Sequence, residues 1–188
     1  MLCSDGMNTS TVLEKIRDFA QDRDIQDIVV ASTSGKTGVK AAEIFEDTDI
    51  NLVVVGHSTG FREENEQEME EGEIKKIRNL GGDIFIGPMI FHNINLPIKE
   101  SSGFSSHNLV ADVLRLFGQG TKVALESVLM ACDAGLIDSG KDVIGMGGTG
   151  SGADTGLLIR SSNSQNLFDA RIREVIVKPS KPENLIYY

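Results

Sequence analysis

The chain has few basic residues, only two cysteines and no long apolar run. Its 188 residues include 18 Lys and Arg against 28 Asp and Glu, which gives a net charge of −10. A nucleic-acid surface needs a basic footprint, so we expect no nucleic-acid partner. No apolar run approaches the roughly 18 residues that span a membrane, and no basic region followed by an apolar one opens the chain. We therefore expect a single globular domain over residues 1–188 in the cytoplasm, with no membrane partner.

Cysteine and acidic spacing gives no sign of a metal centre. Cys3 and Cys132 form no CxxC pair, and Cys132 lies in an apolar helical stretch, where a small core residue is a better interpretation than a nucleophile. Glutamates crowd residues 63–71, and Lys and Arg follow at 75–78. This polarity suits a solvated helix over 61–80, and no EF-hand spacing occurs there. We predict no metal.

Apolar, β-branched runs alternate with small polar turns and amphipathic helices along most of the chain. This alternation predicts an α/β fold of three layers, α/β/α, with a mostly parallel sheet. Strands are predicted over 28–31, 50–55, 83–87, 142–146, 155–160 and 173–178, and helices over 11–20, 37–45, 61–80, 107–117 and 121–134. Thr11 and Glu14 suggest a capping box for the first helix. Residues 1–8 are too few and too polar for an element, and 88–106 is expected to be a long loop or lid.

The segment that organises the chain is DIVVASTSGKTGVKAAEIF, residues 27–45. A buried strand ends in the turn Ser32, Thr33, Ser34 and Gly35, and an amphipathic helix begins near Lys36 and Thr37. Free N–H groups and the helix dipole make such a turn suitable for an anion, most often a phosphate. A Walker A loop would need Gly at position 30, where the chain has Val30. The alternative is that Ser34 or Thr37 only caps the helix.

The second predicted strand ends in a similar turn, Gly56 to Gly60, which contains His57. Ligands of parallel sheets gather at the carboxyl ends of the strands, so His57 stands where chemistry would occur. Arg62 lies at the mouth of this turn, where a guanidinium would fork onto a phosphate. A bystander role for His57 is the alternative.

A glycine-rich stretch, GGTGSGADTG, follows the strand predicted at 142–146. Gly145, Gly147 and Gly150 satisfy GxGxxG, but a dinucleotide fingerprint must open a helix. Here the apolar run 155–160 follows, so we expect a loop between two strands. Gly147, Gly148, Thr149 and Gly150 would let a ligand approach the backbone closely, and Asp154 would accept a hydrogen bond from it. A hairpin connection without function is the alternative.

The helix predicted over 121–134 is apolar around most of its circumference. Such a helix is buried against the sheet or against a second subunit, so a homo-oligomer built on this helix is one prediction. Lys122 and Glu126 stand four residues apart on it, and we expect them to pair with each other.

Several stretches together resemble the stand-alone relatives of the pyruvate kinase C-terminal domain. They are VVASTSGKTG at 29–38, GFRE at 60–63, ACDAGLI at 131–137, VIGMGGTGSGADTG at 143–156 and FDARIREVIVKP at 168–179. The resemblance implies a mixed sheet of about five strands, mostly parallel, with one edge strand reversed. It also implies that Ser32 to Thr37 hold a phosphate, as the matching turn does in allosteric pyruvate kinases. Such relatives carry an additional strand before the first helix, for which residues 1–8 are too short. No kinase barrel precedes the domain, so we do not expect phosphorylation of pyruvate.

These observations predict a domain that binds a phosphorylated small molecule, with a mononucleotide such as FMN as the ligand. Ser32 to Thr37 would hold the phosphate, with His57 and Arg62 at the side and Gly147 to Asp154 over the remainder. The alternative is an enzyme, a flavin-dependent reductase or a phosphate-ester hydrolase, with His57 as acid or base. The sequence presents no nucleophile–base pair that decides between them.

Overall fold

A single mixed sheet of seven strands forms the centre of the computed structural model, which describes residues 1–185. The strands are β1 (Leu2–Cys3), β2 (Asp27–Ala31), β3 (Asn51–His57), β4 (Asp83–Gly87), β5 (Asp142–Gly147), β6 (Thr155–Arg160) and β7 (Arg171–Lys178). The helices are α1 (Thr9–Arg23), α2 (Lys36–Phe45), α3 (Glu71–Asn79), α4 (Asn95–Ser102), α5 (Ser106–Arg115) and α6 (Gln119–Asp133), with short 3-10 turns η1 (Ser164–Asp169) and η2 (Pro182–Asn184).

The sheet is mostly parallel, with the strand order β1-β7-β6-β5-β2-β3-β4. Only β6 is reversed, because it pairs antiparallel with both β5 and β7 while the other neighbours are parallel. The predicted α/β class with a mostly parallel mixed sheet is therefore confirmed. The sheet has seven strands rather than about five, and the reversed strand lies inside it rather than at an edge.

The prediction that residues 1–8 form no element was wrong. Leu2 and Cys3 make a two-residue ladder with Val177 and Lys178 of β7. So short a strand forms through backbone pairing and has no apolar pattern of its own. Its side chains therefore give no signal from which the strand could be predicted.

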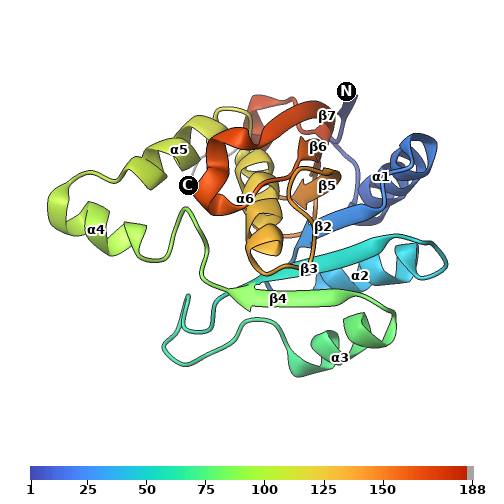
Figure 1. Ribbon diagram of the computed structural model, residues 1–188, viewed down its shortest axis with the longest axis horizontal. Coiled ribbons are helices and arrows are strands. Elements are labelled where there is room, and N and C mark those ends of the chain that lie inside the picture. The colour runs from blue at the N-terminus through green and yellow to red at the C-terminus, as the bar shows by residue number, and fades with distance from the viewer. Residues whose placement is uncertain (186–188) are drawn as a thin grey trace.

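Helices cover both faces of the sheet (Figure 1). α1, α2 and α3 lie together on one face, and α5 and α6 lie on the other. Each face has its own core: Leu13, Ile16 and Ile28 belong to the first, and Val53 and Leu129 belong to the second. Strands with buried residues on both faces read as continuous apolar runs, which is the pattern in β2 and β3.

Helix α6 is enclosed by its own chain. Twelve of its fifteen residues are buried, and it contacts β5, β2, β6 and α5. Its apolar circumference is therefore explained by the sheet and not by a second subunit. Cys132 is a buried core residue, as predicted, and burial raises the pKa of its thiol to about 11. Lys122 and Glu126 form the expected ion pair, with both residues buried.

Three predicted elements differ in extent. Only Glu71–Asn79 of the predicted helix 61–80 is helical; the chain before it forms an irregular loop that includes Asn65 at a φ of 66°. The expected long loop at 88–106 contains helix α4. At the start of α1 the cap is Asn8, whose side chain accepts a hydrogen bond from the Thr11 N–H, rather than a Thr11–Glu14 box.

The N-terminal segment is tied to the C-terminal one through Asp5. Its Oδ2 accepts hydrogen bonds from the N–H groups of Ser180 (3.1 Å) and Lys181 (3.0 Å), and its Oδ1 accepts one from Asn184 Nδ2 (2.6 Å). Hydrogen bonds from the Cys3 thiol, Asn184 and Ser180 hold the pKa of Asp5 well below its usual range.

Replacing Asp5 with alanine is expected to loosen residues 180–184 at neutral pH without unfolding the sheet. Because the folded-state pKa of Asp5 is lowered, the tie stabilises the protein at neutral pH and is lost as the pH falls below about 4. Hydrogen exchange should show faster exchange of the Ser180 and Lys181 amides in Asp5→Ala, and a smaller change in Asp5→Asn, which keeps an acceptor. Unchanged exchange rates in Asp5→Ala would show that Asp5 does not hold residues 180–184 in place.

Within residues 1–185, no helix is both long enough and apolar enough to cross a membrane.

Candidate functional site

Two of the predicted loops leave the sheet from neighbouring strands. β2 pairs with β5, and Val30 lies opposite Met146 near their carboxyl ends. From β2 the chain builds outward to β3 and β4, then returns by α4, α5 and α6 to place β5 on the other side of β2. This reversal is a topological switch point, the place where ligands of open α/β sheets bind. Residues 32–35 and 148–154 both start there.

The start of α2 offers free backbone donors. Gly35 is its N-cap, with a φ of 90°, and a Cβ on this residue would lie 2.5 Å from Glu73 Cβ. The Gly38 N–H donates to Ser32 Oγ (3.1 Å). In the described part of the chain, the backbone N–H groups of residues 34–37 meet no hydrogen-bond acceptor. Four successive free donors at a helix start form an anion-binding arrangement.

The side chains of this turn are unequally available. Ser32 and Thr37 are buried, Thr33 and Ser34 are half-buried, and Lys36 is exposed. The Ser32 hydroxyl already caps the helix through Gly38, so the alternative in which Ser34 or Thr37 is the cap was wrong. The exposed ammonium of Lys36, the free N–H groups and the Thr37 hydroxyl beside them are the parts of the turn that a ligand would meet.

His57 ends β3 and lies beside this turn. Its Nε2 is 3.4 Å from Thr33 Oγ1, and its Nδ1 is 2.8 Å from Glu68 Oε2. Glu68 Oε1 in turn forms a salt bridge with Arg62 Nε at 3.0 Å. Thr33, His57, Glu68 and Arg62 therefore form one connected chain of polar contacts, called the His57 cluster below.

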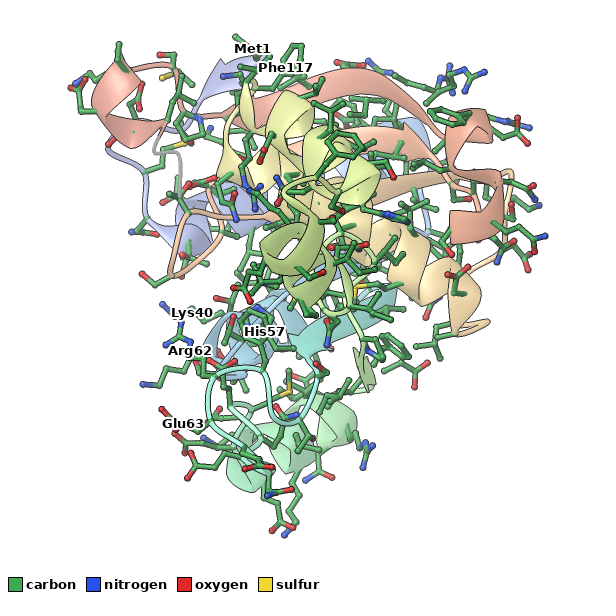
Figure 2. All side chains as sticks on the ribbon, turned by 90° about the vertical axis from the view of Figure 1, so that its left-hand side faces the viewer. Met1, Lys40, His57, Arg62, Glu63 and Phe117 are labelled. Atoms are coloured by element: carbon green, nitrogen blue, oxygen red, sulfur yellow. The ribbon has the colours of Figure 1, made fainter. Side chains whose placement is uncertain are left out.

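Figure 2 looks onto this edge of the molecule and shows His57 and Arg62 in the same region, with Glu63 farther out. Arg62 is 68% exposed on its side chain, whereas Glu68 is 16% exposed. The carboxylate thus lies between the half-buried imidazole and an outer guanidinium.

Glu68 was missed by the sequence interpretation, which assigned it to the solvated face of a helix. The loop between β3 and α3 instead turns this one glutamate inward. Gln67 holds the loop through hydrogen bonds from its Nε2 to the His57 carbonyl and to Thr59 Oγ1, both 3.2 Å. Gly60 and Asn65 both adopt a positive φ. Gly and Asn are the residue types that tolerate this conformation, and they are the signal in the sequence that favours a loop here.

Two further side chains, Phe61 and His92, lie near the imidazole of His57. The Phe61 ring lies 4.4 Å from the His57 ring and 5.1 Å from that of His92, between centroids. Burial, reinforced by the positive charge of Lys122, lowers the pKa of His92 below its usual value. The side chain of His92 is therefore neutral at neutral pH, and it contributes an uncharged polar ring rather than a charge.

The glycine-rich loop is a hairpin connection, as predicted, because β5 and β6 pair with Gly147 opposite Thr155. Gly148 and Gly152 approach so closely that a Cβ on Gly148 would lie 2.2 Å from the Gly152 carbonyl oxygen. The Ala153 N–H donates to Thr9 Oγ1 (3.2 Å), which holds the loop against the start of α1.

Asp154 is already engaged inside this loop. Its Oδ1 accepts a hydrogen bond from Thr155 Oγ1 (2.6 Å) beside the start of α6, where a Cβ on Gly120 would lie 2.7 Å from the same oxygen. Gly147, Gly148, Thr149 and Gly150 thus lie at and beyond the end of β5, the strand that pairs with the one leading into Ser32. The structure links His57 and Arg62 through Glu68, and it directs one oxygen of Asp154 to its own neighbour.

Two surface hollows lie away from these loops, along the last turns of α2. One encloses about 100 Å³ and the other, more open, about 480 Å³. Neither contains a predicted site residue. They are lined by Ala42, Phe45, Glu46, Thr48, Ile50, Leu52, Leu80 and Gly81, and by Arg17, Gln21, Glu43, Ile44, Asp47 and Thr48. Across the described chain, no group of three or more His, Cys, Asp or Glu is placed to hold a metal ion.

Comparison with known proteins gives only slight similarity. No family model matches the chain. The solved structures that it resembles include an O-ureido-L-serine synthase, at 23% identity and a TM-score of 0.32, over 59% of this chain and 29% of that one. They also include a pyruvate kinase from Cryptosporidium parvum, at 12% identity and a TM-score of 0.37, over 76% of this chain and 21% of the kinase. The chain thus spans less than a third of either protein.

Proposed function

We propose that the protein binds a phosphorylated small molecule at the carboxyl ends of β2 and β5. The observation that carries this proposal is the row of free N–H groups at residues 34–37, which begins at the positive-φ Gly35 and stands at the positive end of the α2 dipole. A phosphate would accept hydrogen bonds from these N–H groups and would form an ion pair with Lys36. Arg62 would approach from the side after exchanging its contact with Glu68 for one with the ligand.

FMN is the ligand that we propose. A mononucleotide has one phosphate, which would bind the turn at residues 34–37, and a flat ring, which would pack closely on the backbone. Gly147, Gly148 and Gly150 carry no side chain that would obstruct this ring. Thr149 and the second carboxylate oxygen of Asp154 are the polar groups of that loop that would contact the ligand. A sugar phosphate is the alternative ligand, since it would use the same turn.

We also propose that the chain is a stand-alone relative of the pyruvate kinase C-terminal domain and works in the cytoplasm. The five sequence stretches of that resemblance support the first statement. Both cysteines are free thiols, which suits a reducing compartment and supports the second.

Self-association is proposed through α4 and α5 rather than through the enclosed α6. Leu109 and Val113 lie on one face of α5, and Leu116 and Phe117 follow at its end; all four are more than half exposed, as are Ile94 and Phe104. The segment 94–117 carries two basic residues (Lys99, Arg115) and two acidic ones (Glu100, Asp112), so a second copy of this acidic chain meets no repulsion there. Figure 1 shows α4 projecting from the body. Light scattering should give a dimer mass that Leu116→Ser with Phe117→Ser reduces to the monomer mass; a monomeric parent protein would reject this proposal.

Equilibrium titration with FMN tests the ligand assignment. We expect saturable binding at one site per chain, with riboflavin, which lacks the phosphate, binding at least about tenfold more weakly because it loses a charge-assisted contact. Equal affinity for FMN and riboflavin would contradict the phosphate site. Binding of ribose 5-phosphate but not of FMN would keep the phosphate site and exclude the flavin.

A further inference from the structure

We propose that the His57 cluster is a general-base site that hydrolyses a phosphomonoester bound at residues 34–37. The proposal rests on the phosphate site described above and adds a reaction to it. His57 is the catalytic base, Glu68 is the residue that positions it, and the substrate class is a phosphate ester of a small alcohol or nucleoside.

The two nitrogens of His57 have different partners, and this difference defines the role. Glu68 is a carboxylate and accepts a hydrogen bond from the Nδ1–H group at 2.8 Å, which leaves the lone pair on Nε2. Nε2 points at Thr33 Oγ1, 3.4 Å away, in the turn that leads into the free N–H groups. The base thereby contacts the residue that immediately precedes the free N–H groups.

Glu68 is itself held in place. Arg62 binds its other oxygen at 3.0 Å, and Gln67 Oε1 accepts a hydrogen bond from the Met69 N–H at 2.8 Å, which fixes the next residue of the loop. A carboxylate with both oxygens engaged keeps one orientation and therefore one tautomer of the imidazole.

The environment suits proton transfer. The side chain of His57 is 27% exposed, so water reaches it, while the Phe61 ring covers one side at 4.4 Å between centroids. His92, neutral because of burial and Lys122, adds no competing charge. The free N–H groups of residues 34–37 would stabilise the negative charge that builds on the phosphoryl oxygens in the transition state.

The reaction needs only the phosphomonoester and water. The oxygen of a water molecule forms a bond to phosphorus while its proton passes to His57 Nε2, and the bond between phosphorus and the ester oxygen breaks. The leaving alkoxide keeps the electron pair and takes a proton from solvent. The imidazolium, stabilised by Glu68, then releases its proton to solvent, and an alcohol and inorganic phosphate are the products.

The test measures release of inorganic phosphate from FMN and from p-nitrophenyl phosphate, together with FMN affinity, on the same purified full-length chain. We expect the parent protein to release phosphate and His57→Gln to reduce kcat by about 10²–10⁴-fold, with FMN affinity changed less than about threefold. Glu68→Gln removes the carboxylate that holds the Nδ1–H group of His57, so kcat should fall by about 10–100-fold while KM changes little. A merely structural role for Glu68 would instead change kcat and KM together.

Matched controls are His107→Gln and Glu64→Gln. Both residues are exposed and lie outside the His57 cluster, and both variants should retain parental rates. FMN binding without phosphate release from either substrate would overturn the inference and leave the binding function standing. Equal phosphate release by the parent protein and His57→Gln would also overturn it. If the protein binds neither FMN nor ribose 5-phosphate and releases phosphate from neither substrate, both proposals are overturned.

Discussion

Replacing Glu126 with leucine is expected to lower the free energy of unfolding by about 3–5 kcal/mol. Lys122 and Glu126 are 3% and 4% exposed within α6, and they neutralise each other there. The substitution would leave the Lys122 ammonium buried without a counter-charge. It would also remove the oxygen that accepts the Phe91 N–H at 2.7 Å, which ties the segment after β4 to α6.

Urea unfolding of three variants separates these two contributions. Glu126→Gln keeps an acceptor for Phe91 but leaves Lys122 unpaired, so it should be destabilised less than Glu126→Leu. Lys122→Met combined with Glu126→Gln removes both charges and should recover most of the loss, because a neutralised buried pair costs little. A loss below about 1 kcal/mol in Glu126→Leu would mean that water or another group reaches Lys122.

Replacing Lys36 with alanine together with Thr37 with valine is expected to weaken FMN binding by roughly 100-fold or more. A hydrogen bond to a charged group contributes about 1.5–3 kcal/mol, and each 1.4 kcal/mol is a factor of about ten. Lys36 is exposed and Thr37 is buried at the helix start. Valine keeps the volume of threonine, so the fold should persist.

Lys40→Ala is the matched control for this variant. Lys40 is also exposed on α2, one turn beyond Lys36, and its removal lowers the net charge by the same amount. Titration calorimetry should show parental affinity in Lys40→Ala. Equal weakening in both variants would indicate a general electrostatic effect, and parental affinity in the Lys36 and Thr37 variant would reject the assignment of the turn.

The main strands and helices of this chain were predictable because their signals are local. Continuous apolar runs such as 52–55 belong to strands buried on both faces. The apolar stripe of α2 and the apolar circumference of α6 reflect their burial on the sheet. The hairpin at 148–154 was also predictable, since an apolar run and not a helix follows the glycines.

Features that depend on pairing between distant segments could not be predicted. β1 exists because Leu2 and Cys3 lie beside β7, some 175 residues away in the chain. The same holds for β6, whose reversed direction follows from the short hairpin but whose place inside the sheet depends on β7. The loop–helix boundary at Glu71 was obscured because glutamates are common in both conformations.

The candidate site was predictable in part. Ser32 to Thr37, His57 and the glycine loop were singled out because they follow strands, and strand ends meet at one edge of a parallel sheet. Glu68 was not, because one inward glutamate among six cannot be recognised without the loop that orients it. Its contact with His57, at 2.8 Å, is the feature that suggests chemistry beyond binding.

The measurement that tests the central claim most directly is a titration of the ¹⁵N-labelled protein with FMN, followed through its backbone amide resonances. The account predicts that the amides of Ser34, Gly35, Lys36 and Thr37 shift saturably, because they are the donors for the phosphate, and that riboflavin leaves them in place. Resonances that stay unchanged at residues 34–37 while FMN binds elsewhere would contradict it.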